Sequence, residues 1–274
     1  MQSSSFDLMA SLIVIKNLQC PLGCALDLNQ SVAEANDCVN DAADIEGFDP
    51  MERVYLVYDD KELVGWVSYD CFEAGKMLSD IAIEQISPSS VLSADTTALE
   101  AVQIFATSKM HFFFVLDHSQ ITGTFMYNDL YFGLPFKLCL FALTLSLEDN
   151  ALRLLLKNPK ESWEALSPNR RKKAVKEYKK RFGNDPEARK PPLGDLLRCT
   201  MFCDKGTILK KRKDLPGTSG KKVESIFRRA EKVRNDCAHT SPDLETAVLD
   251  RHKLYQFIRD VKETIEAIHS TVRE

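Results

Sequence analysis

An internal repeat in the first 134 residues constrains the fold of this chain more than any other feature of its sequence. The first copy has a helical pattern, LNQSVAEANDCVND, followed by an apolar segment, an Asp-rich turn and a second apolar segment in RVYLVYDDKELVGWVSYD. The second copy has a short strand and a capped helix in SPSSVLSADTTALEAVQIFATSKM, followed by HFFFVLDHSQITGTFMYNDL. The copies are about 60 residues apart. Each predicts a helix followed by two strands and a polar turn between them.

Charge divides the chain into an acidic and a basic half. Residues 1–134 carry 5 Lys+Arg and 20 Asp+Glu, a net charge of −15, whereas the remaining 140 residues carry 31 and 20, a net charge of +11. This asymmetry indicates that the second half binds a polyanion, for which nucleic acid is the commonest candidate. The alternative is that the two halves attract each other or another copy of the chain.

The composition is that of a globular protein, with 44% hydrophobic and 28% charged residues, and 274 residues suffice for two domains. The N-terminal segment has no basic stretch before its apolar run, and the longest later apolar run, LCLFALTLSL, is about half a membrane span. We therefore expect a cytoplasmic protein without a membrane partner. The eight cysteines include two CxxxC pairs, neither with an adjacent His, which predicts reduced thiols and no metal site.

The positions of Asp and Gly residues in the acidic half resemble those of a known protein family. In each copy a strand ends in Asp, at Asp59 and Asp117, a glycine follows in the next strand, at Gly65 and Gly123, and the second copy closes with NDL. With these features, residues 5–135 resemble a tandem pair of CBS domains, known as a Bateman module. The resemblance implies that an adenosine nucleotide binds between the copies. A Ser or Thr after the glycine and an Asp three residues later would hold it.

Each copy keeps part of that nucleotide-binding signature. The first has Ser68 and Asp70 but Cys71 at the expected Asp position, and the second has Asp129 but Met126 at the hydroxyl position. The candidate nucleotide-binding residues are therefore Ser68, Asp70 and Asp129. Because the first half has few cations, a highly charged nucleotide would be repelled unless a dimer partner or a metal helps. Ligand sensing and a purely architectural, dimerising role remain the two alternatives.

The patterns become helical from Leu134 onwards. FKLCLFALTLSLEDNALRLLLKN predicts one long helix ended by Pro159, and SPNRRKKAVKEYKKRFGNDPEARKPP predicts a basic helix. LGDLLRCTMFC predicts a short helix, and the Gly and Pro residues of DKGTILKKRKDLPGTSGKK predict a flexible basic loop. A fourth helix begins near Lys221, and a last helix runs from about Asp243 to Val272.

The hexapeptide RNDCAH, Arg234 to His239, lies at the predicted end of the fourth helix. An Arg followed by Asn, with His five positions after the Arg and helices around it, resembles the HEPN domain over residues 136–272. The resemblance implies a metal-independent ribonuclease whose site is composed across a homodimer. The catalytic candidates are then Arg234, Asn235 and His239, with Glu148 as the acidic residue on the first helix.

The chemistry of metal-free RNA cleavage suits these residue types. The 2′-hydroxyl must be deprotonated, the leaving 5′-oxygen protonated, and the charge on the phosphorane neutralised. Histidine can perform the two proton transfers because its ordinary pKa of about 6.5 allows both protonation states near neutrality. Arginine neutralises the charge through its planar fork of donors. The alternative is structural: Arg234 pairs with Glu231 or Asp236, and His239 satisfies a helix C-terminus.

Three basic runs in the second half make an electrostatic track for a phosphate backbone plausible, with binding that weakens steeply with salt. The candidate RNA-binding residues are Arg170, Arg171, Lys172, Lys173, Lys210, Lys211, Arg212 and Lys213.

We therefore expect an α+β chain: an N-terminal α/β CBS pair over residues 1–134 and an all-α HEPN bundle over residues 135–274. The expected function is that of a homodimeric endoribonuclease in stress, toxin or defence. We expect this enzyme to require no cofactor for catalysis and to be regulated by an adenosine nucleotide. The alternative is a non-catalytic nucleotide-sensing or protein-interaction module that dimerises through both domains.

Overall fold

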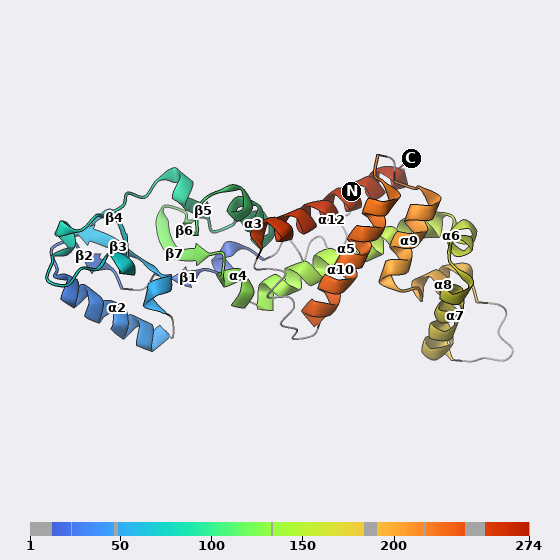
Figure 1. Ribbon diagram of the computed structural model, residues 1–274, viewed down its shortest axis with the longest axis horizontal. Helices are drawn as coiled ribbons and strands as arrows, with labels where there is room; N and C mark the ends of the chain where they lie inside the picture. Colours follow the sequence, from blue (N-terminus) through green and yellow to red (C-terminus); the bar gives the residue numbers. More distant parts are fainter. Residues whose placement is uncertain are drawn as a thin grey trace. The chain divides into compact units, whose positions relative to one another are not determined.

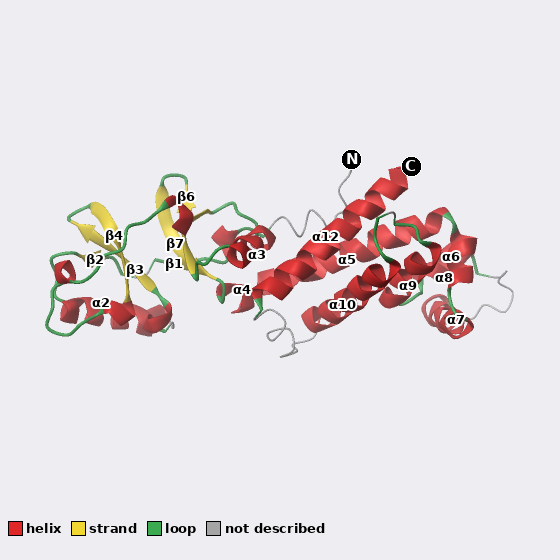
Figure 2. Ribbon diagram, turned by 45° about the horizontal axis from the view of Figure 1, so that its top comes forward, coloured by secondary structure: helices red, strands yellow, loops and turns green. Residues whose placement is uncertain are grey.

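The computed structural model describes residues 13–22, 24–46, 49–132, 134–183, 191–215, 217–238 and 250–273. The chain divides into two compact units. We call Val14–Thr97 with Ser108–Phe132 the sheet unit, and Ala98–Thr107 with the helices that follow residue 133 the helical unit. The chain is thus α+β, with two small sheets in one unit and helices throughout the described part of the other (Figure 2).

The sheet unit contains two sheets, with strand orders β1-β7-β6-β5 and β2-β3-β4. Its strands are β1 (Cys20–Pro21), β2 (Leu26–Asp27), β3 (Val54–Asp59), β4 (Glu62–Ser68), β5 (Val91–Ser93), β6 (Phe112–Asp117) and β7 (Gln120–Met126). Its α-helices are α2 (Val32–Glu46) and the short α4 (Asp129–Phe132). Its 3-10 helices are η1 (Ile15–Asn17), η2 (Pro50–Glu52), η3 (Tyr69–Cys71), η4 (Leu78–Asp80) and η5 (Pro88–Ser90).

The two copies of the repeat build their sheets in the same way, which confirms the predicted strands and turns. In each sheet a short strand pairs in parallel with the first strand of a hairpin: β2 with β3, and β5 with β6. The hairpins β3–β4 and β6–β7 share one register, with Val57 opposite Gly65 and Val115 opposite Gly123, and the register shifts directly after each valine. The hairpin turns place Asp60 and His118 at φ values of 54° and 57°.

The two glycines are required by close backbone contact. A Cβ on Gly65 would collide with the carbonyl oxygen of Glu84, and a Cβ on Gly123 would collide with the carbonyl oxygen of Cys20. In both sheets a further backbone segment therefore crosses the second hairpin strand at the equivalent position, since only glycine leaves room for it.

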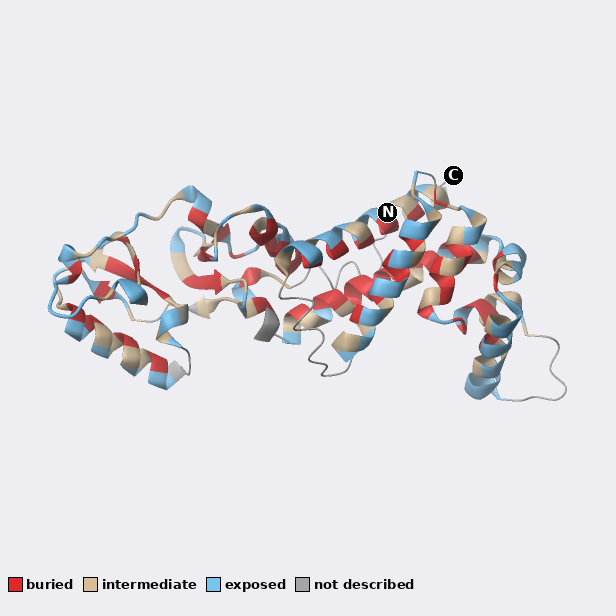
Figure 3. Cartoon of the chain, viewed as in Figure 1, coloured by how far each residue is buried: buried red, intermediate tan, exposed pale blue. Residues whose placement is uncertain are grey.

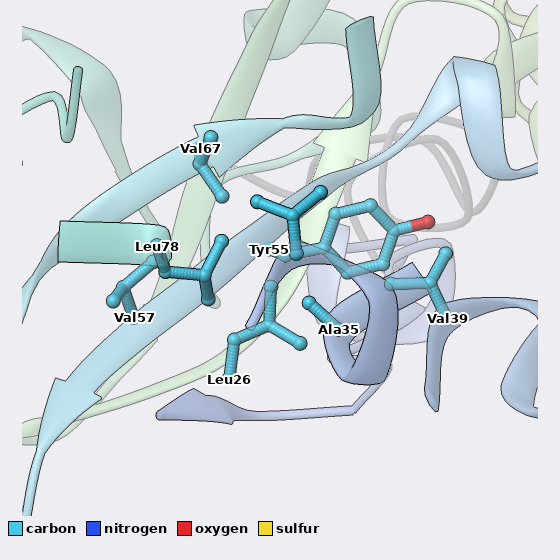
Figure 4. Packing of buried hydrophobic residues seen from close by; sticks show 8 residues of the cluster. Leu26, Ala35, Val39, Tyr55, Val57, Val67 and Leu78 are labelled. Carbon is cyan, nitrogen blue, oxygen red and sulfur yellow. The ribbon is translucent and has the colours of Figure 1, made fainter. Parts of the chain in front are cut away.

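Apolar side chains fill the space between each sheet and its neighbours. In the first copy, residues of β2, β3 and β4 pack against α2 and η4 (Figure 4); the cluster comprises Leu26, Val32, Ala35, Val39, Tyr55, Val57, Val67 and Leu78. A second cluster joins the two hairpins of the sheet unit. There the ring of Trp66 meets that of Phe112 edge-on, with 4.9 Å between centroids, a favoured aromatic geometry.

The helical unit contains seven described α-helices besides the one contributed from within the repeat. That contributed helix is α3 (Ala98–Thr107), which packs against α12 and α5. The others are α5 (Leu134–Lys157), α6 (Pro159–Ala165), α7 (Pro168–Phe182), α8 (Leu193–Arg198), α9 (Phe202–Arg212), α10 (Gly220–Ala238) and α12 (Arg251–Arg273).

The long helix α5 is the centre of the helical unit, because α9, α10 and α12 all pack on it (Figure 1). Its buried residues lie on more than one face, as expected of a helix that several others cover. The predicted inward stripe of α12 is buried from Leu254 to Ile268. A hydrogen bond also joins α12 to α5: the ring of His269 lies 2.7 Å from the side-chain oxygen of the buried Asn150. The predicted positions of this last helix before Asp250 lie outside the described residues.

The prediction of a flexible loop after Cys203 is wrong. Residues Phe202–Arg212 form α9, whose first turn is capped by the Asp204 carboxylate accepting from the Met201 N–H at 3.1 Å. Gly206 lies inside this helix. It is needed there because α9 and α10 approach each other closely at this position. The rings of Phe202 and Phe227 lie 5.5 Å apart across that contact.

We expect Gly206→Ala to destabilise the helical unit by about 1–3 kcal/mol through overpacking. The added Cβ would lie 2.5 Å from the Cβ of Phe227, so the two helices would have to separate. Thermal unfolding followed by circular dichroism measures the loss. Gly194→Ala in α8 is the control, because its Cβ would meet the flexible end of Leu156 at 3.3 Å. Equal melting temperatures for the two variants would contradict the close-packing explanation.

Candidate functional site

A pocket of about 800 Å³ lies within the helical unit, between residues of α5, α7, α8, α9 and α10. It is lined by Glu148, Lys173, Ala174, Lys176, Glu177, Lys180, Arg181, Arg198, Cys199, Thr200, Met201, Phe202, Asp204, Glu231 and Arg234. Two of the predicted catalytic residues, Glu148 and Arg234, are in this set although they are 86 positions apart in the sequence. The pocket has the volume of an ordinary small-molecule site.

Arg234 is held on three sides. Its Nη1 donates to Glu148 Oε2 at 3.2 Å, its Nη2 donates to Asn235 Oδ1 at 3.4 Å, and its guanidinium carbon lies 5.1 Å from the centroid of the Phe202 ring. A guanidinium has five N–H donors, so these two hydrogen bonds leave others for a ligand in the pocket. The side chain is 27% exposed, so it is partly accessible from solvent while its position is restrained.

Glu148 joins Arg234 to a buried lysine that the sequence analysis did not single out. Lys205 Nζ lies 2.9 Å from Glu148 Oε1 and also donates to the carbonyl oxygen of Thr200 at 3.2 Å. Its side chain is only 2% exposed. The Lys205–Glu148–Arg234 cluster therefore carries two positive charges and one negative charge, and Arg234 and Glu148 are both partly exposed, at 27% and 24%. This arrangement favours an anion beside Arg234.

Burial disfavours the thiolate form of two cysteines near the site. Burial, helped by the charge of Asp236, raises the pKa of the Cys237 thiol to about 11. Burial likewise raises the pKa of Cys199, which lines the pocket. Because the thiolate is the reactive form of cysteine, burial lowers the reactivity of these two thiols.

Of the other motif residues, the structure describes those up to Ala238, the last residue of α10. Asn235 is exposed and accepts the long hydrogen bond from Arg234. His239, the predicted proton-transfer residue, lies outside the described residues and follows Ala238, the last residue of α10. The alternative partners suggested for Arg234, Glu231 and Asp236, are not the ones the structure gives it, since its ion pair is with Glu148.

Most of the predicted RNA-binding cations have protein partners. Arg170 pairs with Asp204 at 3.3 Å, Lys210 pairs with Glu224 at 2.7 Å, and Arg171 and Lys211 donate to backbone carbonyl oxygens. Arg212 is 5% exposed, pairs with Asp214 at 3.1 Å and donates to Ser162, so it holds the fold and cannot reach a phosphate. Of the eight candidates, Lys173 alone lines the pocket.

The candidate nucleotide-binding residues of the sheet unit are only partly accessible. Ser68 donates to Asp70 at the surface. The carboxylate of Asp129 accepts from the Met126 N–H at 2.7 Å and from Cys20 Sγ at 3.5 Å, and it lies 3.8 Å from Arg53 Nη1. With an 11% exposed side chain, Asp129 is engaged by the protein, whereas Ser68 and Asp70 are open to a ligand.

The sequence analysis missed two features of the pocket region, of which a sequence pattern could have revealed the first. Lys205 interrupts the buried stripe of Phe202, Ile208 and Leu209, and a lysine at a core position of a helix signals a buried charge partner. The loop prediction concealed that pattern. The pocket cations Lys176, Lys180 and Arg198 come from separate parts of the sequence, and only the folded chain brings them together.

Within the described residues, no group of three or more His, Cys, Asp or Glu side chains could hold a metal ion. None of the described helices is long and apolar enough to cross a membrane.

Comparisons with known proteins find little similarity to this chain. No protein-family model and no curated protein matches the sequence. Among solved structures, the chain is similar to the CBS domain of a bacterial CNNM/CorC family Mg2+ transporter, solved in complex with ATP. The two are 12% identical with a TM-score of 0.34, over 46% of this chain and 89% of that one. That TM-score is too low to infer a shared fold or ligand from it.

Proposed function

We propose that the helical unit is a metal-independent endoribonuclease of the HEPN type, in which Arg234 binds the scissile phosphate and His239 transfers protons. The observation that carries the proposal is the Arg234–Glu148 ion pair of 3.2 Å at the edge of a cation-rich pocket. It brings an acidic residue of the first helix to the motif arginine, as the HEPN resemblance implies.

The proposed reaction is an internal phosphoryl transfer. The 2′-oxygen attacks the adjacent phosphorus as its proton passes to a base, and the bond from phosphorus to the 5′-oxygen breaks as that oxygen receives a proton. The products carry a 2′,3′-cyclic phosphate and a 5′-hydroxyl. Arg234 neutralises the charge that grows on the phosphorane oxygens. One His239 performs both proton transfers in sequence, or a homodimer supplies a second copy.

Glu148 and Lys205 position the arginine in this mechanism. The carboxylate fixes one edge of the guanidinium, and the buried ammonium prevents Glu148 from cancelling the whole charge of Arg234. The ring of Phe202 makes a cation–π contact with the guanidinium of Arg234. A restrained donor loses little freedom when the transition state forms, which is the basis of electrostatic catalysis.

The test is cleavage of a labelled RNA by the full-length protein in EDTA, beside His239→Ala. The proposal expects cleavage by the first and none by the second. Cleavage that requires added magnesium, or that persists in His239→Ala, would rule the mechanism out. A folded protein that cleaves no RNA would favour the alternative, a non-catalytic interaction module.

The proposal also gives the sheet unit a regulatory role, with an adenosine nucleotide as effector. Its support is the exposed Ser68–Asp70 pair at the end of β4, where the CBS resemblance implies ligand contacts. An effector regulates only if it binds one state of the protein better than the other.

We expect AMP to bind more tightly than ATP in EDTA, because 5 cations against 20 carboxylates in residues 1–134 repel additional phosphates. Ser68→Ala should weaken AMP binding about 2- to 10-fold by removing one hydrogen bond. Isothermal titration calorimetry measures both effects, with Ser119→Ala in the second hairpin turn as the control. Tighter binding of ATP than of AMP, or equal affinities of the two serine variants, would contradict this assignment.

A further inference from the structure

One side of the pocket is a row of lysines on α7. Lys173, Lys176 and Lys180 are spaced by three and four residues, which places them on one face of a helix, and all three line the pocket. We call these residues the α7 lysine face. Each is exposed, and Figure 3 shows α7 with little buried surface. Ala174 is the one residue of this helix that is buried.

The carboxylates of the pocket do not neutralise the α7 lysine face, because most have other partners. Glu177 accepts from Arg181 at 2.8 Å, and this hydrogen bond lowers the pKa of Glu177. Asp204 pairs with Arg170, and Glu148 is shared between Lys205 and Arg234.

Four other cations of the pocket are at most weakly compensated by the described residues, since the charge of Lys180 still interacts with that of Glu177. Within the described ranges, no ion pair is found for Lys173, Lys176, Lys180 or the exposed Arg198 at the end of α8, although all four line the pocket. The remaining carboxylate of the pocket is that of Glu231, which accepts a hydrogen bond from the Cys203 N–H at 3.4 Å. Like charges gathered in a concave site raise the local concentration of anions, so the pocket is suited to a ligand with several negative charges.

We infer that the α7 lysine face and Arg198 bind the phosphates that flank the scissile one, and that the substrate is single-stranded RNA. This inference rests on the proposed function, since it takes Arg234 as the site of the scissile phosphate. Lys173 and Lys180 are seven residues apart, about 10 Å along a helix axis, which spans about three phosphates at 3.4 Å per nucleotide of a stacked strand. A pocket of about 800 Å³ has room for part of an unpaired strand.

Lysine is suited to this role. Its ammonium is a point charge on a flexible stem, so it follows a mobile backbone without imposing a base sequence. Recognition by the lysine face is therefore expected to depend on the number of phosphates and on salt, and not on sequence.

The experiment measures binding of the full-length protein to a fluorescent single strand of 2′-O-methyl RNA, which keeps the phosphates but lacks the attacking hydroxyl. Fluorescence anisotropy is recorded over a series of KCl concentrations for the wild type and for Lys176→Gln/Lys180→Gln. The matched control is Lys172→Gln/Lys179→Gln, which removes the same charge from another face of α7 that does not line the pocket. Arg198→Gln is a second variant on a different helix.

The pocket pair should lose about 10-fold in affinity at 0.1 M salt. Its plot of log affinity against log salt should become shallower by about 1.4, from two lost contacts at about 0.7 each. Arg198→Gln should reduce the slope by about 0.7. The control pair should bind with a slope close to that of the wild type. Equal losses in the two lysine pairs, or a wild type that does not bind the strand, would overturn the inference.

Cleavage of unmodified RNA by the same proteins separates this inference from the proposed function. A wild type that binds through the α7 lysine face but does not cleave refutes the nuclease and retains the binding site. A wild type that cleaves, with equal losses in the two lysine pairs, refutes the binding site alone. Circular dichroism verifies that each variant keeps the helical content of the wild type.

Discussion

Arg234→Ala is expected to reduce the rate of RNA cleavage about 100- to 1,000-fold, the usual cost of removing one donor that stabilises transition-state charge. The fold should survive the change, because Glu148 keeps its ion pair with the buried Lys205 at 2.9 Å. The loss should therefore lie in the rate of the chemical step and not in the amount of folded protein. Single-turnover cleavage of a labelled RNA measures it.

Two further variants sharpen this prediction. Arg234→Lys keeps the charge but loses the planar fork that holds Glu148 and a phosphate together, so its activity should lie between wild type and Arg234→Ala. Arg228→Ala is the matched control: it lies on the same helix, is 72% exposed and pairs with Glu224 away from the pocket. Wild-type cleavage by Arg234→Ala, or an equal loss in Arg228→Ala, would refute the role assigned to Arg234.

Glu148→Gln is expected to destabilise the helical unit by about 3 kcal/mol, because it leaves the ammonium of Lys205 buried without its counter-charge. The lysine side chain is 2% exposed, so water cannot replace the carboxylate. Urea unfolding followed by circular dichroism measures the change.

The double variant Glu148→Gln/Lys205→Met is the control for that prediction. Replacing the lysine by an apolar side chain of similar length removes the unpaired charge, so most of the lost stability should return. The double variant should nevertheless cleave RNA more slowly than the wild type, because Arg234 has lost the carboxylate that positions it. If both variants were equally unstable, the destabilisation would not come from the unpaired Lys205.

The strands, turns and long helices could be predicted because each is decided by local pattern. Apolar runs such as FFFVL, with a polar turn before the next strand, specify the hairpins, and the stripe from Val223 to Val233 specifies the buried face of α10. A glycine in a loop and a glycine at a close helix contact cannot be told apart in a sequence. Gly206 therefore contributed to the wrong prediction of a loop where α9 forms. Phe227, 21 residues later, decides its role.

The site could be predicted in part for the same reason. Arg234 is marked by its motif, and Glu148 was chosen as the acidic residue of the first helix; the structure places the two 3.2 Å apart. Local runs of cations were poor guides to the pocket. Arg212 belongs to the KKRK run but is 5% exposed, whereas Arg198 stands alone in the sequence and lines the pocket. Burial and pairing, which depend on tertiary contacts, decide which charges remain available.

The most direct test of the central claim is the chemical identity of the RNA ends that the wild-type protein produces in EDTA. Mass spectrometry of the products distinguishes a 2′,3′-cyclic phosphate with a 5′-hydroxyl from a 3′-hydroxyl with a 5′-phosphate. The account predicts the cyclic phosphate, formed without a metal ion and absent in Arg234→Ala. Products with a 3′-hydroxyl, or cleavage that appears only after magnesium is added, would contradict it.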